Sequence, residues 1–91
     1  MEAERKMNKY GRYQCPCCGY YTFSRPVGDT HEICEVCYWE DDDTQLNNPN
    51  YKGGSNDVSL NQARDNYKKM GACEALFVKT ARKPKDEELP D

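Results

Sequence analysis

The sequence lacks any long hydrophobic run, and residues 1–7 contain no apolar stretch. A membrane-spanning helix needs about 20 consecutive apolar residues, and a signal peptide needs an apolar segment of roughly 7–15 residues. The chain has neither kind of segment. We therefore expect a cytoplasmic protein that has no membrane partner.

The chain also has few hydrophobic residues: they make up 36% of its 91 residues, against 32% that are charged. A chain this short forms one domain, and its apolar core is too small to stabilise the fold alone. Disulfides or a bound metal must supply the rest of the stabilisation, and six cysteines are available. Because disulfides are rare in a reducing cytosol, we expect metal thiolates, with a disulfide scaffold as the alternative.

An excess of basic residues is missing as well, because 13 Lys and Arg stand against 16 Asp and Glu and give a net charge of -3. Four thiolates and one Zn²⁺ would bring this charge to about -5. Such a charge disfavours binding to nucleic acid. A nucleic-acid-associated zinc ribbon is nevertheless the first alternative function, and it would use Lys6, Lys9, Arg12 and Arg25 around exposed aromatic side chains.

The strongest pattern in the sequence is a set of two Cys-x-x-Cys pairs. Cys15 and Cys18 form the first pair, Cys34 and Cys37 form the second, and 15 residues separate the two. Two intervening residues let the chain reverse so that both sulfurs face one ion, and tetrahedral Zn²⁺ takes four thiolates. Gly19 suits the positive φ with which such a turn ends. The spacing predicts one structural Zn²⁺ per chain, and iron is the alternative because it also accepts four thiolates.

Cys17 and Cys73 lie outside the predicted ligand set. Cys17 falls between two ligands, so its side chain should point away from the metal, and Cys73 is expected in the core. The second alternative function is a thiol redox protein or enzyme that uses one of these two cysteines. His31, the only histidine, stands in no recognisable arrangement with a free Cys or Ser, so we predict no catalytic residue.

Short strands are expected around the cysteine pairs. Residues 10–14 and 20–24 are rich in strand-forming residues, and residues 26–29 have the composition of a turn. Residues 30–33 are expected to form a return strand that leads into Cys34. The pattern predicts a small antiparallel hairpin sheet with a cysteine pair at each of two loops.

Residues 42–57 are expected to form a loop, because Asp, Asn, Gly and Pro dominate this stretch. The clearest helix follows at about residues 60–70. Ser59 and Gln62 predict a capping box at its start, and Gly71 predicts its end. Four side chains share one face of this helix and are expected to dock on the sheet: Leu60, Ala63, Tyr67 and Met70.

The acidic run after the second cysteine pair is a candidate interaction edge. It consists of Trp39, Glu40, Asp41, Asp42 and Asp43. One interpretation is an anchored tryptophan followed by solvated charge. The others are a recognition edge for a basic protein surface and a weak site for a hard cation. The preferred function is a non-catalytic module that binds zinc and a protein partner.

Together these elements predict a small metal-stapled α+β domain, in which a C-terminal helix caps a zinc-ribbon-like hairpin sheet. We place this domain at residues 10–79. Residues 1–9 are expected to be a flexible lead-in. Residues 80–91, rich in Lys, Pro, Asp and Glu, are expected to be a charged, disordered tail.

Three motifs stand out when they are taken together. They are Cys-Pro-Cys-Cys-Gly at residues 15–19, Ile-Cys-x-x-Cys-x-Trp-Glu-Asp-Asp at 33–42, and Ser-Leu-x-x-Ala-Arg-x-Asn-Tyr with Gly-Ala-Cys at 59–73. This combination resembles the cysteine-rich CPCC family of bacterial proteins, over about residues 13–84. The resemblance implies a bacterial origin and a zinc-ribbon-like domain, but no activity. The family usually has proline after its third ligand cysteine, where this chain has Glu35, and that departure affects no ligand.

Overall fold

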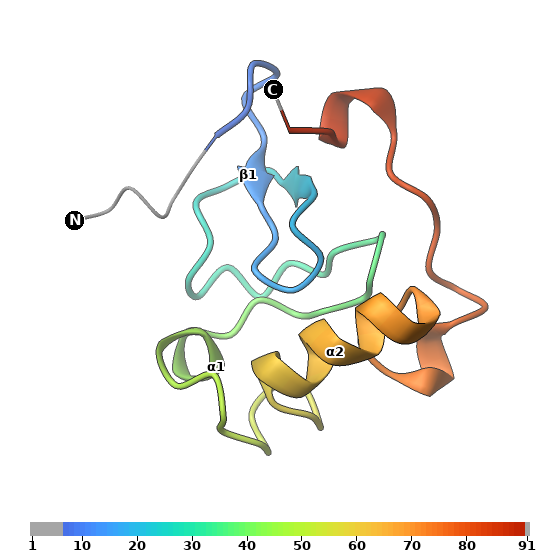
Figure 1. The fold of residues 1–91 in the computed structure, drawn as a ribbon. Coiled ribbons are helices and arrows are strands. Elements are labelled where there is room, and N and C mark those ends of the chain that lie inside the picture. The colour runs from blue at the N-terminus through green and yellow to red at the C-terminus, as the bar shows by residue number, and fades with distance from the viewer. Residues whose placement is uncertain (1–6, 91) are drawn as a thin grey trace.

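The computed structural model describes residues 7–90, which form a small α+β fold (Figure 1). The elements in chain order are β1 (Tyr13–Gln14), β2 (Tyr21–Phe23), α1 (Asp43–Asn47), α2 (Leu60–Met70) and two 3₁₀ turns, η2 (Ala75–Phe77) and η3 (Asp86–Glu88). The sheet lies at one end of the molecule and α2 at the other, with the loops that carry the cysteines between them (Figure 1). The predicted fold class is confirmed.

The sheet consists of β1 and β2, which pair antiparallel with Tyr13 opposite Phe23 and Gln14 opposite Tyr21. The first cysteine pair therefore forms the turn of this hairpin. The expected return strand at residues 30–33 is absent from the described part of the chain, where Ile33 makes only an isolated bridge to Glu40. That bridge flanks the second cysteine pair, so each pair lies at the tip of its own turn.

Side-chain hydrogen bonds explain why residues 26–33 form no strand. The Asp41 carboxylate accepts hydrogen bonds from the backbone N–H of Gly28 (2.8 Å) and from that of Thr30 (3.0 Å). The Glu32 carboxylate accepts one from the Ser24 hydroxyl (2.7 Å). The Asp41 carboxylate thus binds two backbone N–H groups that a strand ladder would otherwise have to satisfy.

Helix α2 has the predicted bounds. The Ser59 hydroxyl accepts a hydrogen bond from the backbone N–H of Gln62, and Gly71 ends the helix at a φ of 79°. The Gln62 side chain instead donates to Asn66 (2.9 Å), so only half of the expected capping box is formed. Leu60 and Ala63 are buried in the core, which anchors the first half of the helix.

The second half of α2 contacts the first cysteine turn. Tyr67 meets Tyr20 edge-on, with ring centroids 6.5 Å apart. Met70 was expected on the docking face, but it is 36% exposed. The docking face therefore ends one turn earlier than the periodicity predicted.

The polar stretch at residues 42–57 is held together by one buried amide. Asp42 caps α1 by accepting a hydrogen bond from the backbone N–H of Gln45. The Gln45 side chain donates to three backbone carbonyls, those of Tyr51, Asn56 and Val58. Gly54 packs so closely that a Cβ there would lie 2.9 Å from Asp42 and from Gln45. The loop thus has a polar interior of its own, which its composition alone did not reveal.

The C-terminal segment runs back along the side of the molecule toward the sheet (Figure 1). Arg82 forms two hydrogen bonds of 2.8 Å to the Glu88 carboxylate, and Glu88 is only 3% exposed. Such a bidentate pair is strong and also fixes the relative orientation of the two side chains. The expected disordered tail is therefore corrected for residues 82–89, which pack against the domain.

The expected flexible lead-in also differs from the structure where it can be compared. Asn8 is buried, and its side-chain amide donates to the backbone carbonyls of Glu87 (2.9 Å) and Leu89 (3.1 Å). Residues 1–6 and 91 lie outside the described residues. The two ends of the described chain thus brace each other beside the sheet.

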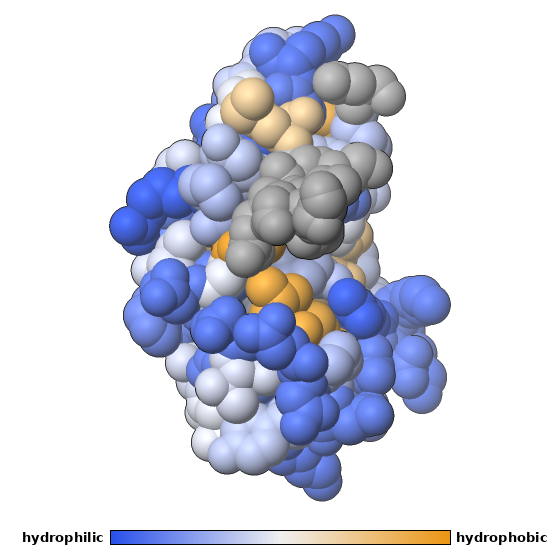
Figure 2. Space-filling model, turned by 90° about the vertical axis from the view of Figure 1, so that its left-hand side faces the viewer, coloured by the Kyte–Doolittle hydropathy of each residue, from blue (hydrophilic) through white to orange (hydrophobic). Residues whose placement is uncertain are grey.

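The core surrounds the cysteines. The largest fully buried side chains include Trp39, Phe23, Leu60, Gln45 and Val36, together with four of the six cysteines. The face drawn in Figure 2 is mostly hydrophilic, with a small hydrophobic patch near its centre. Within residues 7–90, no helix has the length and apolar character needed to span a membrane.

Candidate metal centre

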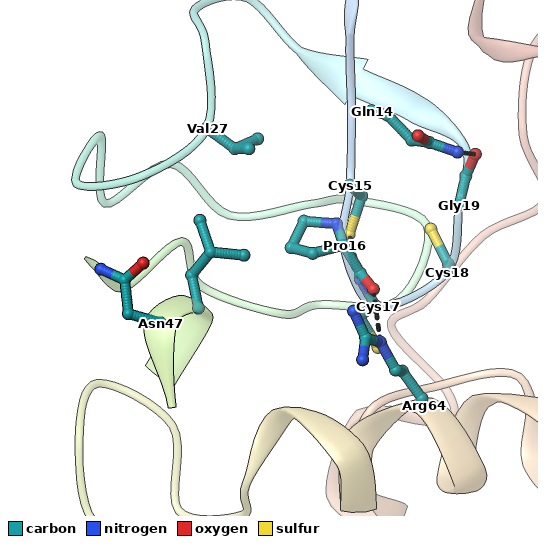
Figure 3. A pocket seen from close by; sticks show the side chains of 10 residues that line it. Gln14, Cys15, Pro16, Cys17, Cys18, Gly19, Val27, Asn47 and Arg64 are labelled. Carbon is teal, nitrogen blue, oxygen red and sulfur yellow. Dashed lines mark hydrogen bonds between the residues drawn. The ribbon is translucent and has the colours of Figure 1, made fainter. Parts of the chain in front are cut away.

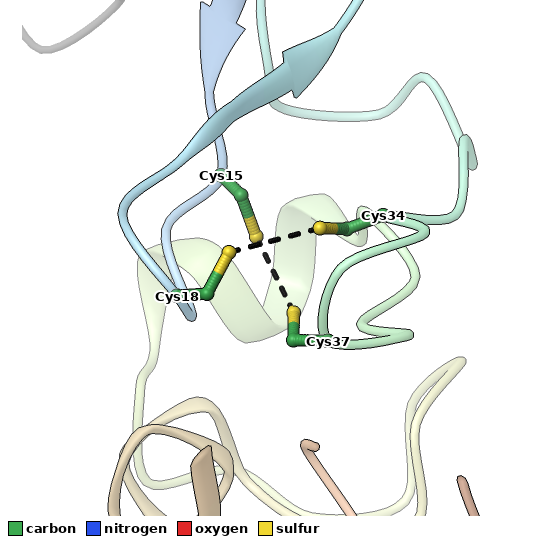
Figure 4. A group of neighbouring side chains, drawn as sticks. All are labelled: Cys15, Cys18, Cys34 and Cys37. Atoms are coloured by element: carbon green, nitrogen blue, oxygen red, sulfur yellow. Dashed lines mark hydrogen bonds between the residues drawn. The ribbon is translucent and has the colours of Figure 1, made fainter. Parts of the chain in front are cut away.

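Four cysteine sulfurs converge at the centre of the core, as Figure 4 shows. They belong to Cys15, Cys18, Cys34 and Cys37, and all four lie within 4.8 Å of one another. The sulfur of Cys15 lies 3.7 Å from that of Cys37, and the sulfur of Cys18 lies 3.7 Å from that of Cys34. The structure therefore brings together the two pairs that the sequence identified.

These distances fit a single metal ion. Four thiolates at about 2.3 Å from a tetrahedral ion lie about 3.8 Å from one another. A disulfide needs a sulfur–sulfur distance of about 2.05 Å. All six cysteines, which lie within residues 7–90, are free, so the disulfide alternative does not describe this arrangement. The cluster has the dimensions of a tetrahedral tetrathiolate site.

The first knuckle, residues 15–20, is built by backbone hydrogen bonds. The Cys15 N–H donates to the carbonyl of Tyr20 (2.8 Å), and the Gly19 N–H donates to the carbonyl of Cys15 (3.0 Å). Gly19 has a φ of 86°, in the left-handed region that favours glycine. The expectation for Gly19 is confirmed, and its conformation turns both sulfurs of the pair toward one point.

The second knuckle, residues 34–39, repeats the same hydrogen bonds. The Cys34 N–H donates to the carbonyl of Trp39 (2.9 Å), and the Tyr38 N–H donates to the carbonyl of Cys34 (2.6 Å). Tyr38 has a φ of 70°, where the first knuckle has glycine. Its ring stacks on Phe77 of η2, with centroids 5.4 Å apart. A long-range ring contact thus supports a backbone conformation that tyrosine rarely adopts.

Electrostatics favour a cation between the sulfurs. Burial, reinforced by the neighbouring thiols, raises the pKa of Cys15 well above its ordinary value. Hydrogen bonds from Cys15, Cys18 and Cys37 hold the pKa of Cys34 well below its ordinary value. The protonation of the four clustered thiols is therefore coupled, and a divalent cation between them lets all four sulfurs ionise.

Arg64 links α2 to the first knuckle. Its Nε donates to the carbonyl of Pro16 (2.9 Å), beside a pocket of about 540 Å³ that also borders Cys18 (Figure 3). Cys18 is the one ligand cysteine that is partly exposed, while the other three are buried. The guanidinium holds the knuckle against the helix through this hydrogen bond. Sequence reasoning assigned no role to this residue.

The two remaining cysteines pack around the cluster. The Cys17 N–H donates to the sulfur of Cys15 (3.4 Å), and the Cys73 N–H donates to the carbonyl of Cys37 (2.8 Å). Both cysteines are buried. Burial raises the pKa of Cys73 to about 12, which keeps its thiol protonated and unreactive at neutral pH.

The acidic run at residues 39–43 is more buried than an interaction edge would be. Trp39, Asp41 and Asp42 are buried, and the two carboxylates accept hydrogen bonds from the loop N–H groups of Gly28 and Ser55 rather than facing outward. Only Glu40 and Asp43 have substantial access to solvent. The predicted interaction edge is therefore corrected: most of the run is structural, because its carboxylates satisfy backbone N–H groups of nearby loops.

The described basic residues of the nucleic-acid alternative each contact an acidic or aromatic side chain. Arg25 lies 3.2 Å from Glu32, and Arg12 lies 4.0 Å from Glu87. The amine of Lys9 lies 5.5 Å from the centroid of the Tyr10 ring. Lys6 lies outside the described residues. His31 is not among the four clustered ligands and lies 3.6 Å from Glu40.

Comparisons with known proteins give one assignment. No curated protein matches the chain in sequence. The model of a family described as Cysteine-rich CPCC matches residues 13–88, a span that holds both knuckles, α2 and η3. The chain therefore belongs to the cysteine-rich CPCC family.

Proposed function

We propose that this protein is a small non-catalytic module that holds one structural Zn²⁺ and binds a protein partner. The observation that carries the metal assignment is the convergence of four sulfurs within 4.8 Å of one another, with two sulfur–sulfur distances of 3.7 Å, which fits tetrahedral tetrathiolate coordination. Zn²⁺ is favoured over iron because tetrathiolate zinc sites are the common structural staple of small domains. A reducing cytoplasm is the compartment in which these thiolates persist.

The zinc is structural because the ligand set is complete. A catalytic zinc keeps one position for water or substrate, with only three protein ligands. Here four thiolates fill the tetrahedron, and three of the four cysteines are buried. The ion thus joins the β1–β2 hairpin to the second knuckle, and its binding energy becomes folding energy.

A protein partner is favoured over the alternatives. Arg12 and Arg25 are engaged by acidic side chains, and the net charge is negative, both of which weaken attraction to phosphates. The raised pKa of Cys73 weakens the case for a thiol redox function. A protein surface is the partner class that tolerates the charge of this domain.

Metal analysis of the purified chain tests the proposal. We expect about one zinc per chain by mass spectrometry, a colourless protein, and loss of the cooperative thermal transition when a chelator removes the metal. Stoichiometric iron, with the colour of iron thiolates, would replace the zinc assignment. A cooperative transition that persists after complete metal removal would contradict the structural role.

A further inference from the structure

A groove of about 270 Å³ lies beside the second knuckle, and none of the four clustered cysteines lines it. Its apolar wall is formed by Ile33, Tyr38, Leu76 and Phe77. Ile33 is 50% exposed and Leu76 is 68% exposed, so two large aliphatic side chains face water at one place. The stacked rings of Tyr38 and Phe77 give this wall a rigid base. We call it the acidic groove, because acidic residues line it as well.

Three acidic residues also line the acidic groove: Glu40, Asp57 and Glu74. No basic residue lines the groove in the described part of the chain. Asp57 and Glu74 line the same groove, where two like charges repel each other, and burial together with the Asp57 carboxylate raises the pKa of Glu74. Within residues 7–90 neither Asp57 nor Glu74 forms an ion pair. A cation placed between them would relieve this repulsion.

The size of the groove limits what it can bind. Pockets for small molecules and cofactors have volumes of about 300–1,000 Å³ and enclose most of the ligand. The acidic groove falls below that range, so it suits one or two side chains of a larger partner. Apolar side chains and carboxylates in one groove select an apolar side chain next to a basic one.

We infer that the acidic groove binds a segment of a partner protein that presents an aliphatic or aromatic side chain next to a lysine or arginine. The apolar side chain packs on Leu76 and the Tyr38–Phe77 pair, and the basic group lies between Asp57 and Glu74. This inference rests on the proposed protein-binding function. It places the basic group of the partner at Asp57 and Glu74, which lie outside the acidic run at residues 39–43.

A random peptide display library, selected on the zinc-loaded full chain, is the probe that tests this inference. We expect enrichment of peptides with Leu, Ile, Phe or Trp adjacent to Lys or Arg. Affinities of the selected peptides are then measured by fluorescence anisotropy for the parent and two variants. The double change Asp57→Asn with Glu74→Gln, and the single change Leu76→Ser, should each weaken binding by about fivefold or more.

Matched controls separate the groove from general effects. Asp65→Asn removes one exposed carboxylate from α2, and Met70→Ser removes a partly exposed apolar side chain from the same helix. Neither residue lines the groove, and both variants should bind the peptides like the parent. Asp57 and Leu76 are exposed, so their replacement should leave zinc content and thermal melting unchanged.

Four outcomes would overturn the inference. They are a selection that enriches no peptide, enriched peptides without basic residues, peptide affinities that neither groove variant alters, and a self-associating parent that Leu76→Ser makes monomeric. In the third outcome a peptide still binds, so the protein-binding function stands and only the groove is wrong. In the fourth the occupant is a second copy of this chain, which sedimentation velocity would detect.

Discussion

The two knuckles make the same hydrogen bonds, yet they are stabilised by different parts of the chain. Gly19 gives the first knuckle its left-handed residue at no steric cost, whereas Tyr38 occupies the same place in the second at a φ of 70°. Tyr38 is compensated by its stacking on Phe77, 39 positions later in the sequence. The first knuckle is thus specified locally, and the second depends on tertiary contacts.

The C-terminal segment adds further long-range contacts to the second knuckle. The Arg82 N–H donates to the carbonyl of Glu35 (3.3 Å) in the second knuckle, and its side chain lies 3.3 Å from the Glu35 carboxylate. The Cys73 N–H bonds to the carbonyl of Cys37. The first knuckle receives a comparable contact from Arg64 of α2. Long-range support is therefore concentrated on the second knuckle, where the backbone strain lies.

Loss of a metal ligand should have the largest effect and should erase the difference between the knuckles. Cys15→Ser and Cys37→Ser should each abolish zinc retention and cooperative unfolding, because structural zinc contributes about 10–16 kcal/mol in small domains. Metal content and thermal melting measure this. Cys17→Ser is the matched control and should keep its zinc. A Cys17→Ser chain without zinc, beside a Cys15→Ser chain that retains it, would overturn the ligand assignment.

Phe77→Ala should expose the dependence of the second knuckle on its ring contact. The change removes a partly buried phenylalanine ring and its stacking contact with Tyr38. It should cost about 2–3 kcal/mol in the free energy of unfolding. In that background Tyr38→Gly should be neutral or stabilising, since it removes backbone strain of about 1 kcal/mol. In the parent the same change should destabilise, because the stacking is lost.

Denaturant unfolding of the four proteins in this double-mutant cycle, all with excess zinc, measures the coupling between Tyr38 and Phe77. Additive effects of the two changes would contradict it. In that case the ring contact does not support the left-handed conformation of Tyr38, and the contrast between the two knuckles fails.

Gly19→Ala should have a smaller effect, confined to the first knuckle. Gly19 has a φ of 86°, and an added Cβ would meet only the Gln14 amide at 3.9 Å. The cost therefore comes from backbone strain and should be about 1 kcal/mol. Gly53→Ala is the matched control for a glycine at a φ of 90° outside the knuckles. Both should lose similar stability by denaturant unfolding, but only Gly19→Ala should lower zinc affinity in a chelator competition.

The sequence predicted the cluster of four cysteines because their spacing is local and chemically specific. Cys15, Cys18 and Gly19 lie together in the chain, and the bounds of α2 follow from Ser59 and Gly71. The roles of Asp41 and Gln45 were missed because their partners lie in separate loops. An acidic run looks solvated in sequence, and only the fold shows which carboxylates meet unpaired backbone N–H groups.

The C-terminal segment was missed for a related reason. Its composition is typical of disorder, and its attachment depends on one buried pair, Arg82 with Glu88, and on the amide of Asn8. The predicted strand at residues 30–33 is absent for the same reason. A side chain from a distant position, Asp41, accepts a hydrogen bond from its backbone at Thr30. In this protein the predictable parts are those whose partners lie within a few residues.

The last prediction tests the attachment of the C-terminal segment through pH. Hydrogen bonds from Arg82 lower the pKa of Glu88. Because the folded-state pKa lies below the unfolded value of about 4.3, the contribution of Glu88 is complete above that value and is lost as the pH falls through the folded pKa. Glu88→Gln should cost about 1–2 kcal/mol in the free energy of unfolding at neutral pH.

Denaturant unfolding of Glu88→Gln and the parent, at several pH values with excess zinc, measures this difference. It should stay constant from about pH 8 to pH 5 and shrink only below the ordinary glutamate pKa, since proton competition for the metal affects both proteins alike. Glu87→Gln is the matched control, because Glu87 is partly exposed and 4.0 Å from Arg12, and it should cost almost nothing. A difference between Glu88→Gln and the parent that already falls between pH 7 and pH 5 would mean that Arg82 does not hold the Glu88 carboxylate. The second knuckle would then be supported without any contribution from the Arg82–Glu88 pair.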